Sequence, residues 1–219
     1  MGVLYDQLAA KLLPGMSIPE PIRKLYDWIE AHGYFVEQAS GARIGFLFPE
    51  AELRAGWTDS ERPGGTIIEI AGSGNSGLEH WFGHDDPKVL NRLCVFAQTG
   101  AEGSMAAFWL NEDGTQKIVH LGSGSGSTLV CILASDAVDF LRLLAIGYDE
   151  ICWNSEFPTP PNEGGELLVQ PNKPFQDWVA TSFDVSIPQT AVEIVKHPNE
   201  IGDENPEDEF ARWVDSNIK

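Results

Sequence analysis

The chain has 219 residues, of which 42% are hydrophobic and 21% charged, an ordinary globular mixture for one domain or one domain with an extension. Its 33 acidic and 14 basic residues give a formal net charge of −19, which disfavours nucleic-acid binding and favours a basic protein partner, or serves solubility alone. No apolar run approaches roughly 18 residues, and the N-terminus has no signal-peptide core. We therefore expect a cytoplasmic protein that neither spans nor binds a membrane.

Two helices are predicted near the N-terminus. The first covers residues 3–13, and the second follows residues 17–21 and ends at His32-Gly33. In the second, apolar residues recur at helical spacing from Ile22 to Ile29. Strands are expected over residues 44–48 and over the β-branched, alternating segment 66–71, and the glycine-rich segment 72–77 predicts a loop.

Four short apolar segments in the middle of the chain predict strands over 93–97, 104–110, 117–121 and 128–133. An Asp-Gly turn joins the second to the third, a strong hairpin signal. Ser135 is expected to cap a helix that Gly147 ends, with Leu141 and Leu144 facing the sheet. The predicted class is α+β, an antiparallel or mixed central sheet with helices mainly on one face.

The composition changes after residue 152. Segment 155–174 is rich in Pro, Gly, Asn and Glu and predicts a loop, and a helix begins at 175–180. Segment 198–208 is acidic and predicts a solvated loop, while Phe210, Trp213 and Val214 predict a last helix. We expect an α+β domain over residues 1–152, with a loop and C-terminal helical extension over 153–219 packed on the same domain.

Two motifs could carry chemistry. His80 and His84 stand four residues apart beside Asp85 and Asp86, a set that could bind zinc on a helix. The intervening glycine and the following proline disfavour that helix, so we expect a surface loop with a cap at Asp85 or Asp86. The serine-glycine segment 122–127 lacks the lysine of a phosphate-binding loop and precedes a strand, so it predicts a flexible connection.

Nucleophiles are not evident either. Cys94, Cys131 and Cys152 lie in apolar sequence without C-x-x-C spacing, which indicates buried, reduced thiols. No G-x-S-x-G elbow is present, and His120 lies in an apolar strand where a packed side chain is expected. The sequence predicts no catalytic residue, no metal site and no cofactor. The tryptophans divide into an expected core set (Trp28, Trp109, Trp178) and a set near loops (Trp57, Trp81, Trp153).

A series of short motifs follows the order of the predicted elements over residues 18–152. They are Ile18-Pro19, Leu25-Tyr26, residues 93–109, Leu121-Gly122-Ser123, residues 128–133, Phe140-Leu141, Leu143-Leu144 and Gly147-Tyr148. Their order resembles the SUKH superfamily (Smi/Knr-like) of bacterial immunity proteins, and the tail from Phe175 to Trp213 is similar to an extension that some bacterial members carry. The resemblance implies a non-enzymatic antitoxin that binds a toxin delivered by a neighbouring cell, as in type VI secretion.

Such a protein would occlude a basic surface or the active site of its cognate toxin, for example a nuclease. Two other classes stay open: a small hydrolase or metal-dependent enzyme using His80 or His84, and a regulatory or scaffold protein of cell-envelope synthesis. The sequence does not indicate the oligomeric state. Acidic residues and aromatic residues near loops suit an interface. Those expected to bind the partner are Glu79, Trp81, Asp85, Asp86, Glu102, Glu112, Asp113, Trp153 and Glu156.

Overall fold

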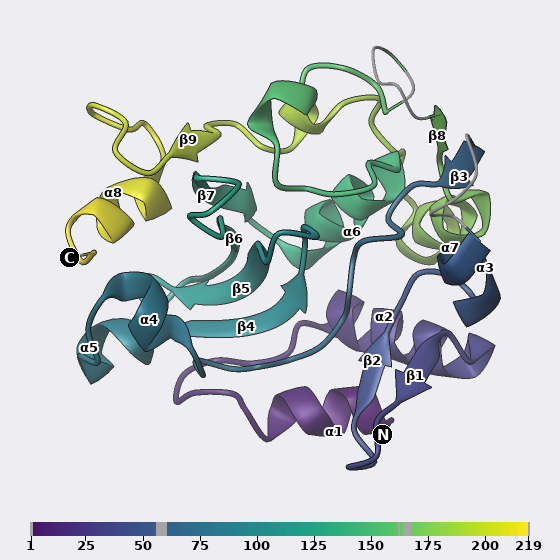
Figure 1. Cartoon of the computed structure of the whole chain (residues 1–219), viewed down its shortest axis with the longest axis horizontal. Helices are drawn as coiled ribbons and strands as arrows, with labels where there is room; N and C mark the ends of the chain where they lie inside the picture. Colours follow the sequence, from purple (N-terminus) through teal and green to yellow (C-terminus); the bar gives the residue numbers. More distant parts are fainter. Residues whose placement is uncertain (1, 56–60, 162, 164–167, 219) are drawn as a thin grey trace.

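The computed structural model describes residues 2–55, 61–161, 163 and 168–218, and the chain folds around a five-stranded antiparallel sheet (Figure 1). Four consecutive strands form a meander, as their apolar segments predicted, and the α+β class is confirmed. Trp57 lies outside the described residues. In spatial order the strands are β4 (Leu93–Gln98), β5 (Met105–Leu110), β6 (Gln116–Leu121), β7 (Leu129–Ala134) and β9 (Asn199–Glu200).

The fifth strand was not predicted, because β9 lies in the segment expected to be a solvated loop. Its two residues pair with Leu129 and Val130 of β7. Asp208 is also buried, and it caps the helix α8 (Glu209–Asp215) while its second oxygen accepts a hydrogen bond from the Ile132 amide at 3.0 Å. A polar strand of two residues has no alternation that could reveal it, so tertiary pairing decides the structure here.

Alternating side chains divide the core between the two faces of the sheet. On the first face Phe96 and Phe108 stack with ring centroids 4.4 Å apart. Four helices pack with this face: α1 (Val3–Ala9), α2 (Glu20–His32), α6 (Ala137–Ile146) and α7 (Lys173–Phe183). Phe140 of α6 meets Phe96 edge-on, and Leu141 and Leu144 are buried, as their spacing predicted.

The cap of α6 differs by one residue from the prediction. Asp136, not Ser135, is the N-cap, because its carboxylate accepts hydrogen bonds from the amides of Val138 and Asp139. Gly147 ends the helix with φ 102°, a left-handed conformation that glycine adopts without strain.

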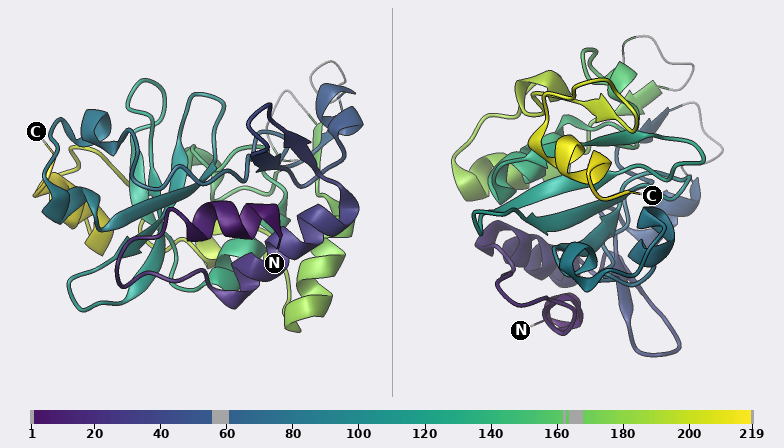
Figure 2. Two further views of the ribbon diagram at one scale, coloured as in Figure 1. Left: turned by 90° about the horizontal axis from the view of Figure 1, so that it is seen from below. Right: turned by 90° about the vertical axis from the view of Figure 1, so that its left-hand side faces the viewer.

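The second face carries its own core. Val95, Trp109 and Val119 pack there with α8 and with two short helices, α4 (Leu78–Phe82) and α5 (Pro87–Leu90). The right-hand view of Figure 2 places strands between the purple N-terminal helices and the yellow α8. The expectation of helices mainly on one face therefore holds for α1, α2, α6 and α7, whereas α4, α5 and α8 lie on the other face.

Segment 66–71 is not a strand, which corrects the prediction. It forms a turn and two isolated bridges, Glu69 with Gln98 and Ile70 with Gly45. Ile67 and Ile68 are buried, so the β-branched pattern marked burial rather than a ladder. The strand predicted at 44–48 is shorter: β2 (Arg43–Gly45) pairs with β1 (Phe35–Glu37) and reaches Ile70 only through the bridge at Gly45.

The remaining elements are short. They are α3 (Glu50–Ala55), the parallel pair β3 (Glu61–Pro63) and β8 (Leu168–Gln170), and the single 3-10 turns η1 (Asn154–Glu156) and η2 (Ala191–Glu193). Over the described ranges, no helix has both the length and the apolar character needed to cross a membrane.

Candidate functional site

Three loops meet at one end of the sheet. The β4–β5 loop and the β6–β7 loop leave from this end because neighbouring strands are antiparallel, and the chain returns here after α6. Hydrogen bonds join the loops: the Ile151 amide donates to the Thr99 carbonyl at 2.9 Å, and the Ser127 hydroxyl donates to the Cys152 carbonyl at 2.6 Å. The Ser123 amide donates to the Ser104 hydroxyl at 3.2 Å. We call the segments 99–104, 122–128 and 147–156 the loop end.

Carboxylates and a thiol converge at the loop end. One ligand atom each from Glu102, Glu150 and Cys152 lies within 4.8 Å of the others. Glu150 accepts hydrogen bonds from the Ala101 amide at 2.8 Å and from the Trp153 indole at 3.5 Å. The Cys152 thiol also points to Glu150, with sulfur and oxygen 3.6 Å apart.

Glu102 is held as a charged group. Burial alone would raise its pKa, but the Ser104 hydroxyl and amide and the amides of residues 102 and 127 donate to it, and the net effect lowers its pKa. The Ser104 amide lies 3.1 Å from the carboxylate. These hydrogen bonds therefore hold the Glu102 carboxylate in place at the loop end.

The negative charge of the cluster raises the pKa values of neighbouring groups. Burial, then Glu150 and Asp149, raise the pKa of the Glu156 carboxyl. Burial, then the carboxylates of Glu150, Glu102 and Glu156, raise the pKa of the Cys152 thiol. The loop end is thus a region of concentrated negative potential that would attract a cation or a basic group.

Two glycines let the loops approach this closely. A Cβ at Gly100 would lie 2.8 Å from the Cys152 sulfur, and one at Gly126 would lie 2.7 Å from Glu102 Cγ. Both distances are shorter than real Cβ contacts allow. The serine-glycine loop therefore approaches Glu102 closely at Gly126, although Gly124, Ser125 and Gly126 are exposed.

His120 lies directly beneath the cluster on β6. Its Nδ1 donates to the Leu129 carbonyl at 2.9 Å, so its Nε2 can accept from the Thr99 hydroxyl at 3.1 Å. Burial, opposed by the bond to Leu129 and by the Glu102 charge, lowers the pKa of His120 to about 4. His120 is thus a neutral, packed side chain, as its apolar strand indicated.

The nine residues predicted to bind a partner do not form one surface. Glu102, Trp153 and Glu156 belong to the loop end, and the Trp81 indole donates to the Gly122 carbonyl at 2.6 Å. Glu112 and Asp113 lie in the β5–β6 turn at the opposite end of the sheet. The remaining three, Glu79, Asp85 and Asp86, lie on or after α4.

Glu150 and Cys152 were not predicted as members of the site. Glu102 could be placed at a sheet end from the order of the strands, but Glu150 arrives there only because the chain turns back after α6. No spacing in the sequence links Glu102 to Glu150, so the site is a product of tertiary structure.

The two histidines of the zinc-like motif do not share a site. His80 is 87% exposed, whereas both ring nitrogens of His84 are engaged: Nδ1 accepts from the Asp86 amide at 3.1 Å and Nε2 donates to the Asn217 carbonyl at 2.6 Å. Asp86 caps α5 through the Lys88 amide, which confirms the predicted cap. Within the described ranges, the group that could hold a metal ion is Glu102, Glu150 and Cys152 instead.

The three cysteines are free and buried, as predicted. Burial raises the pKa of the Cys94 thiol to about 11 and that of Cys131 well above its ordinary value. Since the thiolate is the reactive form, all three thiols are held in the unreactive state.

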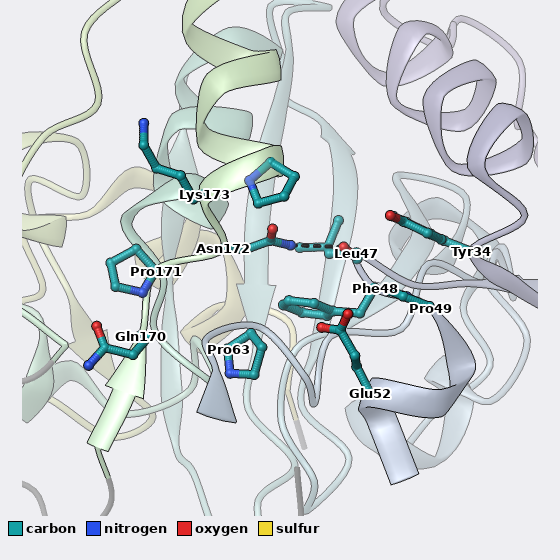
Figure 3. Close-up of a pocket in the computed structure, with 11 residues that line it drawn as sticks. Tyr34, Leu47, Phe48, Pro49, Glu52, Pro63, Gln170, Pro171, Asn172 and Lys173 are labelled. Carbon is teal, nitrogen blue, oxygen red and sulfur yellow. Dashed lines mark hydrogen bonds between the residues drawn. The ribbon is translucent and has the colours of Figure 1, made fainter. Parts of the chain in front are cut away.

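A separate cavity of about 210 Å³ lies between the β2–α3 segment, β3 and the start of α7 (Figure 3). Tyr34, Phe48 and Glu52 line it, and the Asn172 amide group donates to the Leu47 carbonyl at 2.8 Å across its wall. The rest of the wall is rich in proline: Pro49, Pro63, Pro171 and Pro174.

Comparisons with known proteins returned no match to the chain, whether with protein-family models, with curated proteins or with solved structures. The resemblance to the SUKH superfamily therefore stays a prediction.

Proposed function

We propose that the protein is a non-enzymatic immunity protein of the SUKH type, which acts in the cytoplasm and neutralises a basic bacterial toxin by binding it. The observation that carries the proposal is the gathering of four carboxylates, Glu102, Asp149, Glu150 and Glu156, on the linked loops at one end of the sheet. Trp153 lies among them, half-buried, and supplies an aromatic surface of the kind that anchors interfaces.

The chemistry of the loop end supports binding better than turnover. A nucleophile needs a lowered pKa or a neighbouring base, and here the Cys152 thiol has a raised pKa while His120 is buried and already bonded on both nitrogens. The carboxylates create a fixed negative potential that steers a basic protein and opposes acidic ones. Occlusion of a basic active site, such as that of a nuclease, requires no further chemistry.

Co-expression tests the proposal. The chain would be expressed together with a toxin encoded beside it, and the growth of the host would be compared with that of cells making the toxin alone. We expect growth to be restored and a stoichiometric complex to form. Undiminished toxicity, with no other toxin encoded nearby, would contradict the proposal.

One observation favours a second candidate, a metal-dependent enzyme. The grouping of Glu102, Glu150 and Cys152 offers two oxygen ligands and one sulfur ligand, a set that zinc accepts. A cation would bind there in competition with the thiol proton. Stoichiometric zinc in the purified protein, lost in Cys152→Ala, would favour this candidate.

A further inference from the structure

The last long strand of the meander, β7, is paired along only part of its outer edge. It contains six residues, Leu129–Ala134, and β9 pairs with two of them, Leu129 and Val130. Figure 1 shows β9 and α8 in one yellow C-terminal segment next to β7. An apolar edge strand with free backbone N–H and C=O groups is a template for pairing with another strand. How the rest of this edge is covered therefore decides whether the sheet can extend into a second molecule.

The register of β9 shows which backbone group would continue the ladder. The Thr128 carbonyl accepts a hydrogen bond from the Ile201 amide at 2.9 Å, so even-numbered residues of this strand turn their backbone groups toward β9. Ile132 is the first such residue beyond the pairing, and the register places His197 opposite it. However, β9 begins only at Asn199, so the ladder ends before this pair forms.

The Asp208 side chain takes the place of the missing strand carbonyl. One carboxylate oxygen accepts from the Ile132 amide at 3.0 Å, and the other accepts from the Phe210 and Ala211 amides at 2.9 and 3.0 Å. The Asp208 amide donates in turn to the Asn199 side chain at 3.1 Å. A single carboxylate therefore joins the edge of β7, the strand β9 and the first turn of α8.

Capping of α8 alone does not explain why this acid is buried. Asp208 is 3% exposed, and burial raises its pKa against the opposing effects of its three amide donors and of His197. A buried carboxylate is unfavourable unless its oxygens are bonded. Asp136 caps α6 in the same way, through the amides of Val138 and Asp139, yet it is exposed. The feature that distinguishes Asp208 is its bond to the sheet edge.

We infer that residues 197–215, the C-terminal cover, prevent β7 from pairing with β7 of a second copy of this chain, and that Asp208 holds the cover closed. The sequence of β7, Leu-Val-Cys-Ile-Leu-Ala, has no charge and no proline, a composition that favours strand pairing between molecules. Two identical edges are self-complementary when they meet antiparallel about a twofold axis. Self-association through β7 is independent of toxin binding, for which the loop end is proposed.

The variant Asp208→Asn tests the cover in the full chain. Its amide keeps one oxygen to cap α8, but its NH₂ group cannot accept a hydrogen bond from Ile132. Sedimentation would be measured from about 50 µM to about 1 mM protein, in about 0.15 M salt, which screens the net charge of −19 beyond roughly 8 Å. We expect the mass of the variant to rise toward that of a dimer, while that of the unchanged protein stays constant.

Hydrogen exchange of the Ile132 amide locates the pairing. In the unchanged protein this amide should exchange slowly at every concentration, because Asp208 accepts its proton. In Asp208→Asn at about 50 µM it should exchange at least about tenfold faster, since the acceptor is lost. Its protection should return as the concentration rises, because β7 of a second copy then supplies a carbonyl.

Two further variants serve as control and replacement. Asp136→Asn makes the same change at the exposed cap of α6 and should alter neither the mass nor the exchange of Ile132. Asp208→Ser keeps a hydroxyl that caps α8 and should behave as Asp208→Asn does, so it replaces that variant if the latter does not fold. Three outcomes would overturn the inference: fast exchange of Ile132 in the unchanged protein, equal masses of the unchanged protein and the folded Asp208 variant, or a larger mass without renewed protection at Ile132.

Discussion

Acidic residues lie at both ends of the central sheet, but their surroundings differ. At the β5–β6 turn Glu112 and Asp113 are exposed, and the turn is closed by its own backbone and by the Asn111 side chain. At the loop end Glu102 is bonded into its neighbours, while Glu156 and the Cys152 thiol have raised pKa values. The difference arises because segment 147–156, after α6, packs on the loop end, whereas Glu112 and Asp113 stay exposed in their turn.

The comparison separates two uses of acidity. Exposed acids in a turn add to the net charge and to solubility, and neutralising one of them changes little. Acids gathered on linked loops create a local potential and are partly held by hydrogen bonds, so each one has its own effect on folding and on binding. The predictions below, in order of expected effect, test whether the two ends differ in this way.

His120 is predicted to make stability strongly dependent on pH. Its folded pKa of about 4 lies below the unfolded value of 6.5, so its contribution is fully present above pH 6.5 and is lost as the pH falls toward 4. The loss is on the order of 3 kcal/mol for this fully buried group. Urea unfolding at several pH values measures it, by comparison with His120→Asn, which cannot titrate.

His80→Asn is the matched control for His120, because His80 is 87% exposed. Its stability should follow that of the unchanged protein at every pH. Parallel pH profiles for His120→Asn and the unchanged protein would show that His120 does not bind its proton more weakly when folded.

Glu102→Ala is predicted to destabilise the fold by about 1–3 kcal/mol, because the buried Ser104 amide and hydroxyl lose their acceptor. Glu112→Ala removes the same charge from the exposed turn and should cost less than about 0.5 kcal/mol. Chemical denaturation of the two variants decides the matter. Equal losses would mean that the two ends of the sheet do not differ.

Glu156→Gln is predicted to stabilise the protein slightly at neutral pH, by no more than about 0.5 kcal/mol. The pKa of Glu156 is raised by burial and by Glu150 and Asp149, so its charged form is unfavourable in the fold. Stability gained from its protonation grows as the pH falls through the folded pKa, and the variant should lose that part of the pH profile. A destabilised Glu156→Gln would contradict the repulsion assigned to this cluster.

Local pattern explains which parts of this structure could be predicted. Short apolar runs and the Asp-Gly turn predicted β4 to β7, and Gly147 predicted the end of α6. The β-branched, alternating pattern over 66–71 wrongly predicted a strand, because these residues are buried without a ladder, and no local pattern indicated β9. Both errors concern backbone partners that lie far away in the sequence.

The candidate sites were harder to predict from the sequence than the fold. Glu102, Trp153 and Glu156 were selected as acidic or aromatic residues near loops, but so were Glu112 and Asp113, which lie at the opposite end of the sheet. Glu150 and the cavity between β2, β3 and α7 depend on segments brought together only by folding, since Phe48 and Pro171 are more than a hundred residues apart in the chain. Neither has a spacing that a single sequence could reveal.

The affinity of the protein for a toxin encoded beside it, measured by calorimetry for two charge variants, tests the central claim most directly. If the loop end contacts a basic partner, Glu156→Gln should weaken binding about tenfold, and Glu112→Gln by less than about twofold. Both variants remove one exposed charge and should fold normally. Equal effects of the two variants, or no effect of Glu156→Gln, would contradict the claim that the loop end is the binding surface.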